Sequence, residues 1–223
     1  MTSFDDWYLW AKGQDISTFV AELDFSFLTA MQRRRLSPFA RLVFAAAHPL
    51  NEFQIPIVFM SRDGEFTRSF DLLNTLAASE MLSPTSFGLS VHNSVIGQWS
   101  LLYGNKQEMT ALSSREDGLE TAFLESFLFL QEHKKVLVIV AEDPLPFPQP
   151  IAMENKEPFA YAAAFLVEKG DDIQLSLEKS TVKNNTVSNV AGNLTNLRNL
   201  LLDKKEWQHN LKFSQRCWQW KIK

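Results

Sequence analysis

His92 is the histidine whose position most favours chemistry. It lies in the segment Leu89–Asn93, which we expect to join a strand to a helix. Ligands of open α/β sheets often bind at such junctions, because the carboxyl ends of the strands meet there. A buried histidine that is hydrogen-bonded to the backbone is the simpler interpretation. A chemical role for His92 stays an alternative.

A second polar segment, residues 113–117, lies at a predicted strand-to-helix turn, where a nucleophile or an anion site could occur. The structural interpretation is helix capping, in which Ser113 or Ser114 accepts backbone hydrogen bonds and the acidic side chains favour the positive end of the helix. The chemical alternative is an acyl hydrolase that combines one of these serines with His92 and Asp117. No residue spacing requires this triad, since a triad is defined by geometry.

The remaining histidines and the single cysteine favour structural roles. No two histidines are spaced at i, i+3 or i, i+4, so a helical metal site is not expected. His48 precedes a proline and predicts a helix end, whereas His133 and His209 lie among charged residues and predict solvated faces. Cys217 lies beside Trp218 in an aromatic stretch and predicts a small buried group. The sequence contains no phosphate-binding loop, dinucleotide fingerprint or GxSxG motif, and we expect no cofactor.

Composition limits the class of protein. A chain of 223 residues that is 45% hydrophobic can bury one core, so we expect a single domain over residues 1–223, with 183–223 as its C-terminal appendage. The net charge of −4 argues against nucleic acid, and Arg33–Arg35 is the only basic cluster. The first residues are acidic where a signal peptide is basic, and no apolar run approaches the roughly 20 residues of a membrane span. We therefore expect a cytoplasmic protein. The 18 Phe and 6 Trp residues suit a large core or a sizeable interface.

Hydrophobic periodicity predicts alternating strands and helices, which is typical of an α/β protein with a mixed, largely parallel sheet covered by helices. In the first half, the expected elements are a helix from Ser37–Pro38 to Pro49, a strand over Ile55–Ser61, a turn at Arg62–Gly64, a helix around Leu72–Ala77, a short strand over Phe87–Ser90, and a helix over Ser94–Tyr103 ended by Gly104.

In the second half, Val136–Ala141 is apolar at every position and predicts a central strand with helices on both faces. The other expected elements are a strand over Glu108–Leu112, a helix over Glu116–Leu130 that buries Leu119, Ala122, Phe123, Phe127 and Leu130, a hairpin of Ala160–Val167 and Ile173–Leu177 around Gly170–Asp171, a loop over Lys183–Asn196, a helix near Leu197–Glu206, and an edge strand through Trp218, Trp220 and Ile222.

Several ordered segments resemble one family. Residues Ser83–Ser100, SPTSFGLSVHNSVIGQWS, are similar to the β-ketoacyl synthase segment SP-x-F…N-x-x-x-G-x-x-S, and Tyr103–Gly104 continues the match. Leu36–Leu42, Ser61–Glu65 and Leu89–Asn93 resemble β-ketoacyl synthase-like N-terminal domains, the short chain-length factors of aryl-polyene and related type II polyketide systems. The resemblance covers roughly Leu36 to Pro148. It implies half of a thiolase-like fold.

The same resemblance implies that the chain is not a ketosynthase. Thr110–Asp117 occupies the place of the synthase nucleophile elbow, T-A-C-x-S, and Arg115 or Glu116 falls at the cysteine, depending on a one-residue gap. Guanidinium and carboxylate groups cannot replace an acyl-carrying thiolate. No histidine precedes Gly-Thr or follows Gly, and we expect the sequence to end where the second half of such a fold would begin.

The family implies a partner instead. The expected partner is a full-length β-ketoacyl-acyl-carrier-protein synthase, with the acyl carrier protein involved only indirectly. Pairing would use the strand before the elbow, including Gln107, Met109 and Ala111. The residues implied at the partner's acyl tunnel or interface are Arg62, Asp63, Phe87, Leu89 and Val91, with His92 and Asn93 nearby. The alternative is a scaffold or carrier-protein docking subunit, for which Arg33–Arg35 offers the only candidate basic face.

Overall fold

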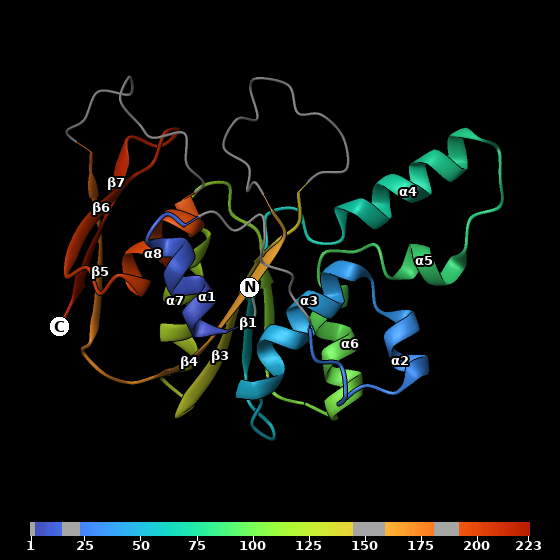
Figure 1. The fold of residues 1–223 in the computed structure, drawn as a ribbon, viewed down its shortest axis with the longest axis horizontal. Helices are drawn as coiled ribbons and strands as arrows, with labels where there is room; N and C mark the ends of the chain where they lie inside the picture. The colour runs from blue at the N-terminus through green and yellow to red at the C-terminus, as the bar shows by residue number, and fades with distance from the viewer. Residues whose placement is uncertain (1–2, 15–22, 145–158, 181–191) are drawn as a thin grey trace.

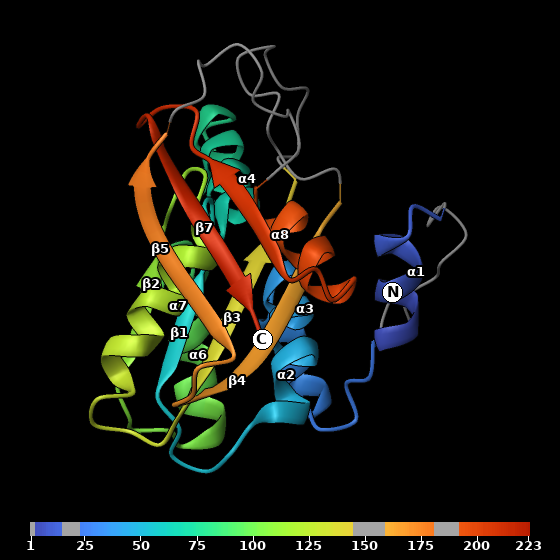
Figure 2. The same cartoon turned by 90° about the vertical axis from the view of Figure 1, so that its left-hand side faces the viewer.

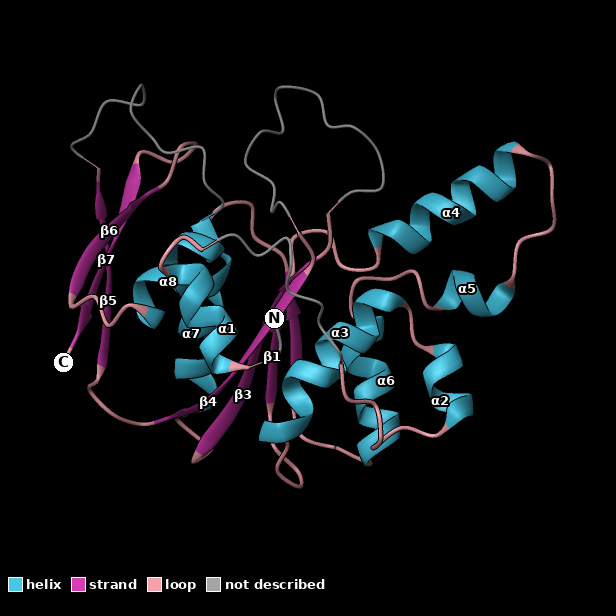
Figure 3. Ribbon diagram, viewed as in Figure 1, coloured by secondary structure: helices cyan, strands magenta, loops and turns pink. Residues whose placement is uncertain are grey.

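A computed structural model describes residues 3–14, 23–144, 159–180 and 192–223. The described helices are α1 (Phe4–Ala11), α2 (Ala30–Arg35), α3 (Pro38–Ala47), the 3-10 turn η1 (His48–Leu50), α4 (Phe66–Ala77), α5 (Pro84–Gly88), α6 (Ser94–Tyr103), α7 (Gly118–Phe129) and α8 (Gly192–Leu201). The described strands are β1 (Ile57–Met60), β2 (Met109–Leu112), β3 (Lys135–Glu142), β4 (Tyr161–Glu168), β5 (Ile173–Lys179), β6 (Glu206–Asn210) and β7 (Arg216–Ile222). Figures 1 and 3 show their arrangement.

The main sheet has the strand order β2-β1-β3-β4. Strand β1 pairs in parallel with β2 and with β3, whereas β4 runs antiparallel to β3. Every residue of β1 is buried, and so is every residue of β3 after Lys135. This burial confirms a central, mixed and largely parallel sheet covered on both faces.

Side-chain alternation along the strands divides the interior into two hydrophobic clusters. Odd-numbered residues such as Ile57, Phe59 and Ile139 pack with α3 and α6, and even-numbered residues such as Val58 and Val138 pack with α7. Figure 1 shows the resulting layers: α3 and α6 on one face of the main sheet, α7 and α8 on the other, and a second sheet beyond them.

Local signals explain the elements around α3 and α6. Ser37 caps α3 by accepting a hydrogen bond from the Ala40 N–H, and Gly104 ends α6 with a φ of 62°, as predicted. The predicted strand over residues 87–90 is wrong, because these residues belong to α5 and the bend after it. Ser83 caps this short helix and Pro84 occupies its first position, which favours a helix over a strand.

The prediction for α7 is correct in position but not in its buried face. Leu119, Ala122 and Phe123 are buried, whereas Phe127 is 60% exposed. Ser126 takes the sheet-facing position, and each helical residue is turned by about 100° from the one before. Phe127 therefore points away from the sheet.

The second sheet has the order β5-β7-β6, and Figure 2 shows it in front of α7 and α8. The predicted hairpin is wrong: β4 completes the main sheet by pairing with β3 along its whole length, and β5 pairs with β7. The predicted edge strand β7 is instead the middle strand, since β5 and β6 flank it. It buries Trp218 and Trp220 on one face.

The last helix begins earlier than predicted. Helix α8 starts at Gly192, inside the predicted loop over residues 183–196, whose first part lies outside the described residues. Glu206, the predicted helix end, begins strand β6. Across the ranges described above, no helix combines the length and apolar character needed to cross a bilayer.

Candidate functional site

The carboxyl ends of β1, β2 and β3 lie at the same end of the main sheet, because the three strands are parallel. The turn of residues 61–64 follows β1, the polar segment 113–117 follows β2, and Glu142 ends β3. Open α/β sheets place their functional loops at this carboxyl end. The structure thus brings the predicted turn at Arg62–Gly64 and the polar segment 113–117 to one place.

The turn after β1 is held by a buried carboxylate. Glu142 is 3% exposed, and its two oxygens lie 2.9 and 3.1 Å from the Arg62 N–H that donates to them. The Ser61 hydroxyl lies 3.5 Å from Glu142 and accepts a hydrogen bond of 2.9 Å from the Gly64 N–H. Sequence reasoning missed Glu142, although an acidic residue directly after an apolar strand was a visible signal.

His92 and Ser113 bind the backbone of the same turn. The His92 Nε2 lies 2.7 Å from the carbonyl oxygen of Ser61, and the Ser113 hydroxyl donates to the carbonyl oxygen of Arg62 at 2.8 Å. Gly64 has a φ of 55°, and a Cβ there would lie 2.9 Å from the His92 ring. His92 is therefore half-buried and bonded to backbone, which is the simpler of its two predicted roles.

The proposed hydrolase triad is not assembled. Ser113 binds the Arg62 carbonyl, and Ser114 donates to the Asp117 carboxylate. Within the described residues, neither serine hydrogen-bonds to His92. The expected capping by a serine is also wrong: Asp117 is the N-cap residue of α7, and its carboxylate accepts a hydrogen bond of 3.0 Å from the Trp218 indole.

Both residues at the predicted nucleophile position are tied to the loop between β6 and β7. The Arg115 guanidinium lies 3.6 Å from the centre of the Phe213 ring, a cation–π contact. The Glu116 carboxylate accepts hydrogen bonds of 3.1 and 3.2 Å from the N–H groups of Lys212 and Phe213. The arrangement gives these side chains structural partners in the second sheet.

A buried polar cluster fastens the second sheet to α7. The Glu120 side chain is fully buried, and its Oε1 lies 2.6 Å from the His209 Nδ1, 2.6 Å from the Asn196 amide and 3.0 Å from the Trp220 indole. Asn196 in turn accepts a hydrogen bond of 2.9 Å from the Trp207 indole. The prediction of a solvated His209 is wrong, because β6 turns this side chain inward, where it is only 13% exposed.

The charges around His209 raise its pKa. Burial disfavours the charged imidazole, but the hydrogen bond to Glu120 and the negative charge of Glu120 favour it. The carboxylates of Asp117 and Glu116 act in the same direction. Together they outweigh burial, so the pKa of His209 lies above its ordinary value of 6.5.

The start of α4 is also anchored at the carboxyl end of the main sheet. Glu65, which is 3% exposed, accepts hydrogen bonds from the Ser37 hydroxyl at 2.5 Å and the Arg68 guanidinium at 2.9 Å. Thr67 donates to Asp143 at 3.1 Å, and burial raises the pKa of this carboxyl against the effect of that hydrogen bond. Beyond its start, α4 has no fully buried residue and extends away from the main sheet (Figure 1).

Strand β2 forms an edge of the main sheet, and no other described strand pairs with its outer side. The carbonyl oxygens of Glu108 and Leu112 accept hydrogen bonds from β1. Because backbone groups alternate along a strand, the N–H groups of Met109 and Ala111 face the open edge. Gln107, just before the strand, is half-buried. This edge is available for pairing with another chain.

The other residues expected at a partner surface differ in exposure. Phe87 and Val91 are 66% and 51% exposed, Asn93 is exposed, and Arg62, Asp63 and Leu89 are half-buried. Leu101 on α6, which the sequence did not single out, is 87% exposed. Large exposed apolar side chains mark candidate contact surfaces.

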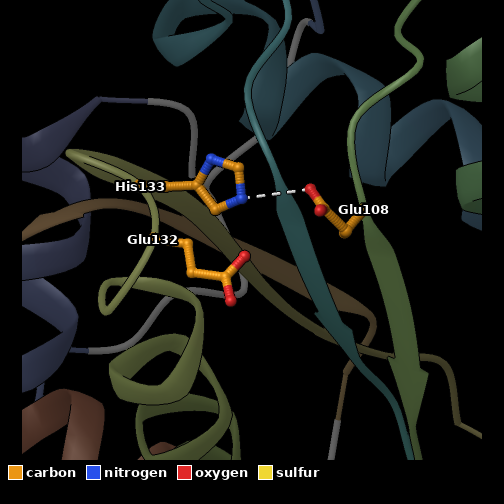
Figure 4. Close-up of side chains that lie close together, drawn as sticks. All are labelled: Glu108, Glu132 and His133. Carbon is orange, nitrogen blue, oxygen red and sulfur yellow. Dashed lines mark ion pairs between the residues drawn. The ribbon is translucent and has the colours of Figure 1, made fainter.

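One group of side chains has the composition of a metal site. Figure 4 shows Glu108, Glu132 and His133, whose ligand atoms lie within 4.8 Å of one another. The His133 Nε2 lies 3.1 Å from the Glu108 carboxylate, as an ion pair when His133 is protonated. Glu132 and His133 also line an open hollow of about 340 Å³. Both carboxylates are exposed, and exposed acidic groups are common without a metal. The composition of this group is therefore not sufficient to assign a metal site.

Comparisons with known proteins agree with one another. The family described as "Beta-ketoacyl synthase, N-terminal domain" matches residues 7–221. Among solved structures, one chain of the complex between the ketosynthase ApeO and its chain length factor ApeC, from Xenorhabdus doucetiae, has a TM-score of 0.81 and 24% sequence identity, over 99% of this chain and 93% of that chain. A search of curated proteins finds no match.

Proposed function

Because the chain belongs to the β-ketoacyl synthase N-terminal domain family, we propose that it is a non-catalytic chain-length-factor subunit that pairs with a full-length β-ketoacyl-acyl-carrier-protein synthase in fatty acid or aryl-polyene biosynthesis. In this role it stabilises the synthase and shapes the far end of its acyl tunnel. The acyl carrier protein is involved only through the synthase.

The observation that carries the proposal is that the segment at the predicted nucleophile elbow has no cysteine. By the resemblance, Arg115 or Glu116, depending on a one-residue gap, falls where this family carries its nucleophile, and both side chains are bound to the β6–β7 loop. The only cysteine, Cys217, is buried in β7, where burial raises the pKa of its thiol. Acyl transfer by the family mechanism needs a reactive thiolate, so what remains for the chain is pairing.

The open edge of β2 supports pairing. A sheet edge with outward N–H groups is a template for a partner strand, and the exposed Leu101 on α6 adds apolar surface. A solved structure that is similar in fold comes from a ketosynthase in complex with its chain length factor. The turn at Arg62–Asp63 and the segment Phe87–Val91 are the parts we assign to the partner's tunnel.

The test of the proposal is co-purification. An affinity-tagged chain, expressed in its own organism, is expected to isolate a full-length β-ketoacyl synthase in a stable one-to-one complex, identified by mass spectrometry and native mass. Isolation of the chain without any synthase would contradict the pairing.

The isolated chain is expected to remain unmodified by acyl donors. Incubation with acyl carrier proteins that bear acyl or malonyl groups should leave its intact mass unchanged and release no carbon dioxide, because the elbow has no thiol. Installing cysteine at Arg115 is not expected to restore condensation, since the decarboxylating histidine pair is missing. A covalent acyl adduct at any residue of the unaltered chain would show that it has its own chemistry.

The second candidate function is a docking subunit for the acyl carrier protein. Arg33, Arg34 and Arg35 are all exposed at the end of α2, and no ion pair of these residues occurs among the described residues. Carrier proteins are acidic, so such a basic cluster suits them. Binding of a carrier protein without a synthase would favour this function.

A further inference from the structure

The turn Ser61–Gly64 is held by hydrogen bonds to side chains from three separate parts of the chain. Glu142 comes from the end of β3, His92 from the segment before α6, and Ser113 from the loop after β2. Their sequence separations from the turn range from 31 to 81 residues. Three unrelated segments thus converge on one four-residue turn.

All three side chains bind the backbone of the turn. Glu142 accepts the Arg62 N–H, His92 contacts the Ser61 carbonyl oxygen, and Ser113 donates to the Arg62 carbonyl oxygen. Bonds of this kind fix the path of the chain whatever side chain the turn carries. They therefore determine where the side chains of Arg62 and Asp63 begin.

The buried carboxylate is the costly member of this arrangement. Burying an ionised carboxylate is unfavourable unless hydrogen-bond donors surround it, and Glu142 is 3% exposed. Its donors here include a backbone N–H of the turn itself. A glutamine would still offer one carbonyl oxygen to that N–H, whereas an alanine would offer none. The two substitutions therefore separate the hydrogen bond from the rest of the side chain.

We infer that Glu142, His92 and Ser113 are positioning residues that fix the Arg62–Asp63 turn and thereby set the length of the acyl chain made by the paired synthase. The inference rests on the proposed function. It gives His92 and Ser113 a role without chemistry, in agreement with their bonds to backbone carbonyls. With the backbone of the turn held by these bonds, the Arg62 and Asp63 side chains start from fixed positions, and in this role they form the steric stop for a growing chain.

The experiment uses the purified complex of the chain with its synthase and compares product lengths by mass spectrometry. Arg62→Ala and Asp63→Ala first establish whether the turn influences product length. Glu142→Ala is then expected to change the ratio of longer to shorter products by at least about fourfold, the effect of one methylene of burial. Glu142→Gln should keep the parental distribution. Glu80→Ala, which removes an exposed carboxylate that makes no side-chain hydrogen bond among the described residues, is the matched control.

Ser113→Ala and Ser113→Thr provide a second pair on an exposed residue, in case Glu142→Ala fails to fold. Alanine is expected to shift product length, and threonine, which keeps the hydroxyl, is expected to restore it. Rescue by glutamine and threonine is a result that general destabilisation would not produce.

The outcomes distinguish the positioning role of these residues from the proposed function of the chain. If the Arg62 or Asp63 variant shifts product length while Glu142→Ala and Ser113→Ala leave it parental in intact complexes, the positioning role is overturned and the proposed function stands. If none of the four variants shifts product length, the turn does not act as the stop, and both the inference and the assigned tunnel contact are overturned.

Discussion

Replacing Glu120 by alanine is expected to lower the free energy of unfolding of the chain by about 3–5 kcal/mol, the usual cost of removing one partner from a buried ion pair. The variant leaves three groups in the interior without their acceptor: the His209 imidazole, the Asn196 amide and the Trp220 indole. Urea denaturation followed by tryptophan fluorescence measures the loss, since Trp207 and Trp220 stack beside the pair.

The pair also predicts how stability depends on pH. Because the folded-state pKa of His209 is raised, the folded state holds this proton more tightly than the unfolded state, where the pKa is about 6.5. The stabilisation is fully present below about pH 6.5 and is lost as the pH rises through the folded-state pKa. His209→Gln is expected to remove this part of the pH dependence.

The matched control is Glu125→Ala, on the same helix but half-exposed, with an expected change of less than about 0.5 kcal/mol. Equal urea midpoints for Glu120→Ala and Glu125→Ala would mean that the buried pair does not hold the second sheet in place.

The double variant Met109→Pro/Ala111→Pro is expected to abolish stable pairing with the synthase. Both residues direct their N–H groups to the open edge of β2, so proline removes donors to the partner without removing a bond to β1. Each lost donor leaves an acceptor of the partner strand unsatisfied, at about 1–3 kcal/mol. Two such losses weaken binding by roughly 30- to 20,000-fold.

Dissociation constants of the purified proteins, measured by titration calorimetry, give the result directly. Met109→Leu keeps the N–H and an apolar side chain of similar volume, and is expected to bind normally. The thermal midpoint of the isolated double variant checks that β2 still pairs with β1. Unchanged affinity in a folded double variant would place the partner on another surface.

Local patterns in the sequence were sufficient for several elements of the main sheet and of the helices that cover it. The cap at Ser37, the continuous apolar run of β3 and the glycine that ends α6 are each decided by neighbouring residues, and all are confirmed. The expected half of a thiolase-like fold is confirmed by the structural comparison as well. At residues 87–90 the helix-start signal of Ser83–Pro84 decides the local structure, so the predicted strand is wrong.

The second half depends on partners that are distant in the sequence. Strand β4 pairs with β3 rather than with β5, so the turn signal at Gly170–Asp171 between β4 and β5 did not decide the partner of either strand. The burial of His209 requires Glu120, 89 residues away. Likewise, the backbone role of Ser113 became visible only when the turn after β1 was placed beside it.

The position of β7 in the middle of its sheet has a consequence for the order of folding. Of the strands in the described residues, β7 is made last by the ribosome, yet both β5 and β6 pair only with it. Until β7 is synthesised, β5 and β6 have no strand to pair with, and the indole of Trp207 lacks its stacking partner, Trp220. The main sheet is complete after β4, some fifty residues earlier by the element bounds. Pairing between distant segments is slow, so the second sheet is expected to close after the β2 edge is already available, and under the proposed function a nascent chain is expected to present this edge to a synthase before it has finished folding.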